Sequence, residues 1–257
     1  MQIPVNTFKQ AIVAGKRQIG LWSHLSNYVS MEVIAGAGFD WILIDMEHSP
    51  NEVFLVHQQL LAMAESSTHP IVRIPWNDAV MTKRIIDLGV QTLLVPQVAN
   101  AAEARRAVQA TRYPAEGGVR GFTGLSRASR FGRVKDYHKL ASEQMCVIVQ
   151  VETAEALRNI EEIAAVEGVD GIFIGPGDLS ASLGQIGNPA HAEVQDQIAD
   201  AIRRIRATGK PAGILTGDET LARKHIEQGC GFVAVGADIA LLARAVEQLA
   251  ARFAHAG

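Results

Sequence analysis

The chain alternates eight short apolar runs with helix-like segments along its whole length. The runs are rich in β-branched and aliphatic residues and are bounded by polar or turn-forming residues, which is typical of buried strands. They lie at residues 19–23, 41–46, 71–75, 92–97, 147–151, 171–175, 212–215 and 232–236. The segments between them include residues 52–64, 101–112, 154–165 and 194–208, which have the apolar spacing of amphipathic helices.

This alternation predicts an α/β fold with parallel strands, because parallel neighbours need a crossover connection and a helix is the usual one. Eight such units in 257 residues match a closed (β/α)8 TIM barrel in count and length. An open doubly wound sheet is the alternative, but no G-x-G-x-x-G motif follows the first run. Without a linker or repeat, residues 1–257 are predicted to form a single domain.

Composition excludes several classes of partner. With 48% hydrophobic residues the chain can bury a large core, and its net charge of -3 provides no basic field for nucleic acid. No run approaches the roughly 18 apolar residues of a membrane span, and the charged N-terminal region lacks a signal-peptide core. We expect a cytoplasmic protein in which Cys146 and Cys230 are buried small apolar side chains.

In such barrels the loops after the strand C-termini build the active site. The second run ends with Asp45, Glu47 and His48. A carboxylate beside an imidazole orients the ring and raises its basicity, so His48 is predicted to transfer protons with Asp45 as partner and Glu47 as a weaker candidate. A solvated surface cluster is the alternative. The Ser-Pro-Asn-Glu sequence at residues 49–52 predicts a capping box that starts the next helix.

Arg73 lies within the apolar run at residues 71–75. A guanidinium there must be solvated or paired, because burying an isolated charge is costly. We expect it to face an anionic ligand at the mouth of the barrel. The alternative is an ion pair with a carboxylate of a neighbouring strand.

Two further carboxylates follow adjacent strands, Glu152 after the fifth and Asp178 after the sixth. Thr153 can cap the next helix and leaves Glu152 free, whereas Asp178 has the alternative of capping its own turn. The glycine-rich exit at residues 175–177 lets backbone amides approach a ligand. Because two carboxylates in one pocket repel each other, a cation is predicted between them, and oxygen ligands suit Mg²⁺ or Mn²⁺.

Two other chemistries are disfavoured. A zinc site would recruit several histidines, yet only His24 and His48 fall near strand C-termini. A Schiff-base aldolase needs a lysine in the site, and every lysine is predicted in a helix, a loop or a strand entry. What remains is a metal that chelates a 2-oxo acid, an arginine for the enolate oxygen and a base, which suits cleavage or formation of a carbon-carbon bond beside a carbonyl.

Seven motifs together make the chain resemble the HpcH/HpaI aldolase family, the metal-dependent pyruvate aldolases, over nearly its whole length. They are Gly-Leu-Trp at 20–22, Ala-Gly-Phe-Asp-Trp at 37–41, Asp-Met-Glu-His at 45–48, Leu-Val-Pro at 94–96, Gly-Val-Arg-Gly at 118–121, Gln-Val-Glu-Thr at 150–153 and Gly-Pro-Gly-Asp-Leu-Ser at 175–180. The resemblance implies reversible cleavage of a 4-hydroxy-2-oxo acid, such as 4-hydroxy-2-oxoheptanedioate or a 2-oxo-3-deoxy sugar acid, to pyruvate and an aldehyde.

The resemblance also implies a role for each matching residue. Glu152 and Asp178 would hold Mg²⁺, Mn²⁺ or Co²⁺, and Arg73 would stabilise the enolate. His48 with Asp45 would move the proton of the C4 hydroxyl group. The remaining contacts would come from the amides of Gly177 and Asp178 to the pyruvate carboxylate, from the apolar walls Trp22 and Leu215, and from Gln150 behind the metal ligands.

The resemblance implies, in addition, a hexamer built as a dimer of trimers that exchange the last helix. The apolar segment at residues 239–253 suits such docking, although it would serve equally well to close its own barrel. The connection at residues 113–137 is unusually long, and we expect it to face a neighbouring subunit or to cover the site. Its Arg120, Arg127 and Arg130 are expected to face the anionic end of a substrate.

The chain departs from the family pattern at Met46, Gln97 and Gly177, which leaves the aldehyde acceptor open. Two other functions stay open at this point. One is an acyl-CoA lyase of the citrate lyase β type, and the other is a protein that binds 2-oxo acids without turnover. The presence of both His48 and Asp45 argues against the second.

Overall fold

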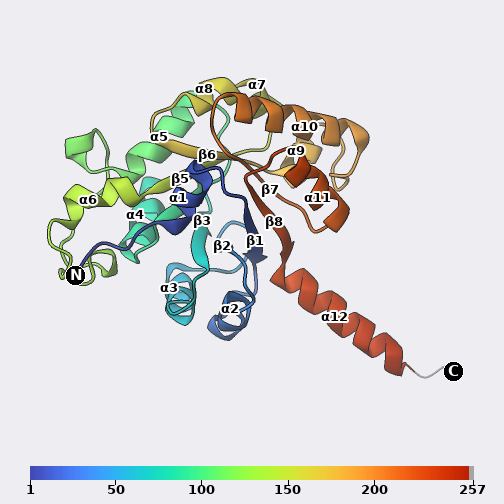
Figure 1. The fold of residues 1–257 in the computed structure, drawn as a ribbon, viewed down its shortest axis with the longest axis horizontal. Coiled ribbons are helices and arrows are strands. Elements are labelled where there is room, and N and C mark those ends of the chain that lie inside the picture. The colour runs from blue at the N-terminus through green and yellow to red at the C-terminus, as the bar shows by residue number, and fades with distance from the viewer. Residues whose placement is uncertain (255–257) are drawn as a thin grey trace.

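The computed structural model describes residues 1–254 and has a closed barrel of eight parallel strands in the order β1 to β8 (Figure 1). Each strand pairs with the next along the chain, and β8 pairs with β1. The strands are β1 Gln18–Ser23, β2 Trp41–Asp45, β3 His69–Arg73, β4 Thr92–Val95, β5 Cys146–Val151, β6 Val169–Ile174, β7 Ala212–Leu215 and β8 Phe232–Ala237. The predicted (β/α)8 barrel is therefore confirmed, and the open sheet is wrong.

Helices follow the strands along the chain, and most of them lie around the outside of the barrel (Figure 1). They are α1 Thr7–Val13, α2 Tyr28–Ala35, α3 Val53–Ala62, α4 Ala79–Asp87, α5 Ala101–Thr111, α6 Tyr137–Gln144, α7 Ala154–Arg158, α8 Ile160–Ala164, α9 Pro176–Ser182, α10 Ala192–Ala207, α11 Glu219–Glu227 and α12 Asp238–Phe253, with 3-10 turns η1 Pro114–Glu116 and η2 Arg127–Ser129. None of the helices within residues 1–254 combines the length and the hydropathy needed to cross a bilayer.

Two helix predictions differ from the structure. The predicted helix at 154–165 is interrupted at Asn159, whose side-chain amide donates to the carbonyl of Ala99 at 2.8 Å. The capping box is wrong because α3 begins only at Val53 and Glu52 makes no side-chain cap. The polar side chains before it turn back to β2 instead: Ser49 Oγ and Asn51 Nδ2 both donate to the carbonyl of Asp45.

Large side chains fill the interior of the barrel, among them Trp22, Trp41, Phe173 and Phe232. Small residues make room for them, since a Cβ at Gly213 would lie 2.0 Å from the ring of Phe232. Helix α1 closes the N-terminal end of the barrel with Phe8, whose ring packs edge-on against Trp41 and Phe232. The C-terminal end has no such plug, so the cavity described below opens there.

Helix α12 projects away from the barrel (Figure 1). Asp238 is its buried residue, and residues 239–254 are all exposed. The helix therefore does not close its own barrel. Its exposed apolar side chains include Ile239, Leu242, Val246, Leu249 and Phe253.

The long connection at residues 113–137 joins α5 to β5 through α6, so it lies towards the N-terminal end of the barrel. Arg120 is buried there, with its guanidinium over the rings of Tyr113 and Tyr137. Arg127 donates to the carbonyl of Leu88, and Arg130 lines a separate small hollow. The expectation that these arginines face the substrate is therefore wrong for the cavity of their own chain.

Candidate active site

A cavity of about 280 Å³ lies at the C-terminal end of the barrel, where strand ends and the loops after them meet. Its lining is Trp22, His24, His48, Arg73, Gln150, Glu152, Phe173, Gly175, Pro176, Gly177, Asp178 and Leu215. The structure thus brings together eight of the nine predicted site residues. The ninth, Asp45, is buried behind Arg73.

Glu152 is buried at the end of β5. As predicted, Thr153 caps the next helix by accepting a hydrogen bond from the amide of Ala156. The side chain of Glu152 takes no part in this cap and lines the cavity. Its Oε1 accepts from the backbone amide of Gln97 at 2.8 Å, and its Oε2 accepts from Gln150 Nε2. The left-handed backbone of Gln97, with φ of 54°, belongs to the turn that presents this amide.

Burial raises the pKa of Glu152 to about 7, although its hydrogen bonds with Gln150 and Gln97 act in the opposite direction. The neighbouring carboxylates of Glu47 and Asp178 raise it further. The cavity therefore holds more acidic charge than its own hydrogen-bond donors neutralise.

Gly175 is required where β6 leaves the barrel. A Cβ at this position would lie 2.6 Å from Glu152 Oε2 and 3.0 Å from Gln150 Nε2. Gly175 is also the N-cap residue of α9, so the interpretation of Asp178 as the cap is wrong. Asp178 lies in the first turn of that helix and is exposed to the cavity.

The donors on this side of the cavity suit a hard divalent cation. Glu152 and Asp178 supply carboxylate oxygens, and Gln150 Oε1 is buried without a hydrogen-bond partner among residues 1–254. Within that part of the chain, no three His, Cys, Asp or Glu side chains are grouped closely enough to ligate a metal by themselves. Mg²⁺ typically takes one or two carboxylates and completes its shell with water and substrate oxygens, so this donor set fits it.

Arg73 is held on two sides by carboxylates. Its Nε and Nη2 donate to Asp45 at 2.8 and 2.7 Å, and its Nη1 lies 2.8 Å from Glu47 Oε2. The guanidinium also lies over the ring of Trp22, 5.0 Å from its centre. The ion pair with a neighbouring strand is thus present, while another edge of Arg73 lines the cavity.

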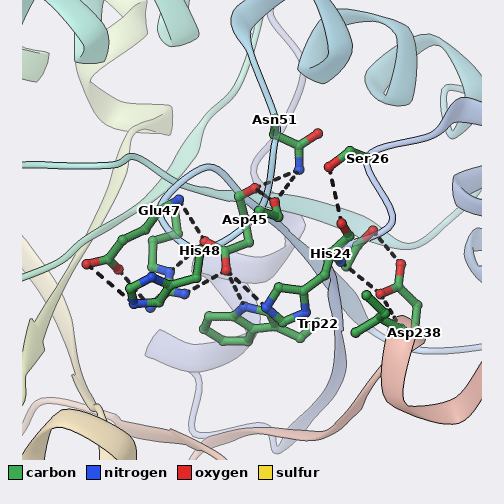
Figure 2. Close-up of polar contacts among 12 residues, drawn as sticks. Trp22, His24, Ser26, Asp45, Glu47, His48, Asn51 and Asp238 are labelled. Atoms are coloured by element: carbon green, nitrogen blue, oxygen red, sulfur yellow. Dashed lines mark hydrogen bonds and ion pairs between the residues drawn. The ribbon is translucent and has the colours of Figure 1, made fainter. Parts of the chain in front are cut away.

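Asp45 is the buried centre of this cluster (Figure 2). Its Oδ2 accepts from Trp22 Nε1 and lies 3.2 Å from His24 Nε2. Although burial opposes ionisation, hydrogen bonds from His24 and Arg73 keep the pKa of Asp45 well below its usual range.

The predicted pairing of Asp45 with His48 is wrong. His48 Nε2 lies 4.0 Å from Glu47 Oε1, and 60% of its side chain is exposed at the mouth of the cavity. Figure 2 shows that His24, rather than His48, is in contact with Asp45. Burial raises the pKa of Glu47, although Arg73 and His48 act in the opposite direction.

Sequence reasoning missed two polar residues of this region as functional candidates. His24 directly follows β1 and lines the cavity, and Asp238 directly follows β8. Asp238 is buried and accepts hydrogen bonds from Ser23 Oγ and from the amides of His24 and Leu25. The rule that polar residues at strand C-termini form the site would have found both.

Comparisons with known proteins identify the family of the chain. Residues 18–245 match the sequence profile of the family described as HpcH/HpaI aldolase/citrate lyase. A Rhizobium etli protein named pyruvate aldolase is 56% identical over 254 residues, covering 99% of this chain and 100% of the relative. An Escherichia coli 4-hydroxy-2-oxo-heptane-1,7-dioate aldolase is 57% identical over 96% of this chain and 95% of its own.

Among solved structures, an HpcH/HpaI aldolase/citrate lyase family protein from Burkholderia cenocepacia J2315 superposes with a TM-score of 0.93. It is 38% identical, and the match covers 96% of this chain and 99% of the other.

Proposed function

Because the chain belongs to the HpcH/HpaI aldolase/citrate lyase family, we propose that it is a divalent-metal-dependent pyruvate aldolase. Its reaction is the reversible cleavage of a 4-hydroxy-2-oxo acid, such as 4-hydroxy-2-oxoheptanedioate, to pyruvate and an aldehyde. One observation carries this proposal: the carboxylates of Glu152 and Asp178 open onto the same small cavity as the guanidinium of Arg73.

Glu152 and Asp178 are the residues that would hold Mg²⁺, Mn²⁺ or Co²⁺, with Gln150 held against Glu152 by its hydrogen bond. When bound, the metal supplies Lewis-acid polarisation of the 2-oxo group, which makes the adjacent carbon easier to leave as a carbanion equivalent. The backbone amides of Gly177 and Asp178 would donate to the pyruvate carboxylate. Trp22 and Leu215 form apolar walls beside it.

Arg73 stabilises the enolate oxygen in this scheme. An arginine has five N–H donors, and two of those of Arg73 donate to Asp45, while its Nη1 forms an ion pair with Glu47. The remaining N–H groups are available for the oxygen that becomes negative as the carbon-carbon bond breaks. Since both carboxylates fix the guanidinium before substrate arrives, little reorganisation is needed during the reaction.

His48 is the proposed base for the C4 hydroxyl group. It removes that proton while the C3–C4 bond breaks, the aldehyde forms, and the bonding electrons pass into the enolate. A proton then returns to C3 and gives pyruvate. Exposure at the cavity mouth lets His48 exchange its proton with solvent, and Glu47 is the carboxylate near its ring.

The test is release of pyruvate from racemic 4-hydroxy-2-oxoheptanedioate, followed by reduction of the product with lactate dehydrogenase. Activity is expected to disappear after treatment with a chelator and to return with Mg²⁺, Mn²⁺ or Co²⁺. Full activity after exhaustive metal removal, together with a lysine adduct trapped by borohydride, would contradict the proposal. Cleavage of a CoA thioester in place of the hydroxy-oxo acid would favour the acyl-CoA lyase.

We also propose that the protein is a homo-oligomer, a hexamer in the form that the family resemblance implies. The exposed apolar side chains Ile239, Leu242, Val246, Leu249 and Phe253 support this, because they form a stripe along α12 that residues 1–254 leave exposed. Replacing Leu242 and Leu249 with glutamate should lower the mass measured by sedimentation. Replacing Arg244, on the same helix, with alanine is the matched control.

A further inference from the structure

We propose that His24 is a positioning residue of this active site and that Asp238 holds it in place. In this arrangement His24 fixes the position of the Asp45 carboxylate, and Asp45 fixes the guanidinium of Arg73. Asp238, the first residue of α12, thereby helps to position a side chain of the cavity. The inference rests on the proposed aldolase function, because it assigns His24 to the half of the reaction that forms the enolate.

The hydrogen bonding of His24 defines what its ring can do. Nε2 lies 3.2 Å from Asp45 Oδ2, and an ionised carboxylate can only accept, so Nε2 carries the proton of this contact. The opposite nitrogen, Nδ1, is buried and has no partner among the described residues. The ring therefore directs its donor at Asp45, and neither nitrogen is engaged with the loop that carries His48.

Asp45 ends β2 and is in contact with residues of both neighbouring strands, β1 and β3; Figure 2 shows its contacts with Trp22 and His24 on the β1 side. From the β1 side, Trp22 Nε1 and His24 Nε2 each approach its Oδ2 at 3.2 Å. From the β3 side, Arg73 forms the two-pronged contact that orients the guanidinium. Hydrogen bonds to a charged group are among the strongest in proteins, so loss of the His24 contact would let Asp45 turn and carry Arg73 with it.

Asp238 holds the chain segment that carries His24. Its carboxylate accepts from Ser23 Oγ at 2.9 Å, from the His24 amide at 2.8 Å and from the Leu25 amide at 3.3 Å. Its remaining bond is to the amide of Ile239, the next residue of its own helix. Asp238 is the buried residue of α12, and its other hydrogen bonds are to the last residue of β1 and to the loop that follows it.

The conformation of that loop depends on such external contacts. Ser26 adopts a left-handed backbone with φ of 53°, which a residue other than glycine keeps only when its surroundings hold it there. Its hydroxyl donates to the carbonyl of His24 at 3.2 Å. The bonds from Asp238 and Ser26 together set the position from which His24 reaches Asp45.

The experiment measures exchange of the pyruvate methyl protons with D₂O by NMR, in the presence of Mg²⁺ or Mn²⁺. This exchange needs the enolate but no aldehyde, so it isolates the half-reaction assigned to Arg73. His24→Leu removes the donor, and His24→Gln keeps a side-chain amide that can donate to Asp45 but cannot act as a base. We expect a loss of about tenfold in kcat for the leucine variant, with KM for pyruvate little changed, and about threefold or less for the glutamine variant.

Three outcomes would overturn the inference. A leucine variant within about twofold of the wild type would show that Asp45 needs no help from His24. A folded glutamine variant as slow as the leucine variant would make His24 a proton-transfer group rather than a positioning residue. A wild-type protein without metal-dependent exchange would overturn the proposed function, and this inference would fall with it.

The link to α12 is tested with Asp238→Ala and with Asp238→Asn, which keeps one acceptor oxygen in case the alanine variant does not fold. The matched control is Asp218→Ala, which removes the cap of α11, a bond to the amide of Leu221. The Asp238 variants should slow exchange severalfold, whereas Asp218→Ala should lower the melting temperature alone. Combining Asp238→Ala with His24→Leu should add little, because residues acting in series are not additive. Fully additive losses would contradict the link.

A structural measurement complements the rates. Trp22 Nε1 donates to the same Asp45 oxygen as His24, so its indole N–H resonance reports the position of that carboxylate. The resonance, assigned with a Trp22→Phe variant, should shift in His24→Leu and in Asp238→Ala but not in Asp218→Ala. An unmoved resonance in the slow variants would contradict the proposed route through Asp45.

Discussion

The two ends of this barrel use buried polar groups in opposite ways. At the N-terminal end, Asn6 is buried and fully paired: it accepts from the amide of Lys9 and donates to Gln91, Thr92 and Gln144. Helix α1 covers that end. At the C-terminal end, charged side chains line an open cavity, and Gln150 Oε1 has no hydrogen-bond partner in the described part of the chain.

The two ends of the barrel also differ in how far their charged side chains are paired with one another. At the N-terminal end, Lys9 and Asp170 form an ion pair at 3.2 Å, and Asp170 also accepts from the amide of Val147. At the C-terminal end, Asp45 and Glu47 pair with the guanidinium of Arg73, and Glu152 and Asp178 line the same cavity without an arginine or lysine paired to them among residues 1–254. The charges of the closed end are therefore paired with one another, whereas the open end has more carboxylates than cationic partners.

The largest effect is expected from Glu152→Gln, which removes one proposed metal ligand and should slow pyruvate release by about 10³-fold or more, since the metal contributes several kcal/mol to the transition state. The control variant at the N-terminal end of the barrel is Asp170→Asn, which should lower the melting temperature and leave kcat unchanged. Steady-state kinetics and thermal unfolding of both variants provide the comparison. A Glu152→Gln enzyme within about tenfold of the wild type would remove Glu152 from the metal site.

Arg73→Ala should follow, with a loss on the order of 10² to 10³ in kcat, the scale of one donor to a developing oxyanion. Arg73→Lys should restore little, because a lysine cannot supply the planar fork that Asp45 and the substrate oxygen share. Arg127→Ala, at the closed end, serves as control and should affect stability alone. Near-normal turnover by Arg73→Ala would exclude the enolate role.

Two glycines that are two positions apart, Gly175 and Gly177, give a sharper comparison within the open end. Gly175→Ala would press a methyl group against Glu152 and Gln150, and a misplacement on the order of 1 Å can cost about 10²-fold in rate. A Cβ at Gly177 meets nothing within 4 Å, so Gly177→Ala should stay within about threefold of the wild type. Similar kcat values for the two variants would argue against a tight cradle around Glu152.

The smallest effect concerns pH and the closed end. Burial lowers the pKa of His69 to about 4, while its Nε2 contacts Thr92 Oγ1 at 2.8 Å and its ring stacks on Phe8. Between about pH 6.5 and pH 4 the unfolded chain binds a proton at this histidine that the folded chain does not. Stability is therefore lost as the pH falls through this window, by about 2 kcal/mol at pH 5 relative to pH 7.

Urea unfolding of the wild type and of His69→Gln at pH 7, 6 and 5, at one protein concentration, measures this contribution. The glutamine variant should be less sensitive to pH over that range. Equal slopes for the two proteins would mean that His69 is not buried in its neutral form.

The strand ends were predictable because their chemistry is local in sequence. Glu152 and Asp178 follow apolar runs and Arg73 lies near the end of one, and closure of the barrel must bring such positions to one rim. The partner of Asp45 was not predictable in the same way. His24 reaches it because β8 returns beside β1 and delivers Asp238 to the loop, a contact between residues far apart in the chain.

Other errors had the same origin in competition between partners. The Ser-Pro-Asn-Glu segment has the pattern of a cap, yet the carbonyl of Asp45 attracts Ser49 and Asn51 before α3 begins. Arg120 was expected near the substrate because of its charge, but two tyrosine rings and Asp87 surround it at the other end of the barrel. The sequence pattern indicates which contacts a side chain is able to make. The neighbours of that side chain in the folded protein determine which of these contacts form.

Helix α12 is fixed to the barrel at its first residue, Asp238, and projects freely beyond it. A change in the tilt of α12 would therefore move Asp238. Asp238 is hydrogen-bonded to the chain segment beside the candidate active site. In the proposed oligomer, loss of the neighbouring subunits would thus misalign the cavity as well as expose the apolar side chains of α12. We predict that specific activity per chain falls on dilution, in step with dissociation of that oligomer.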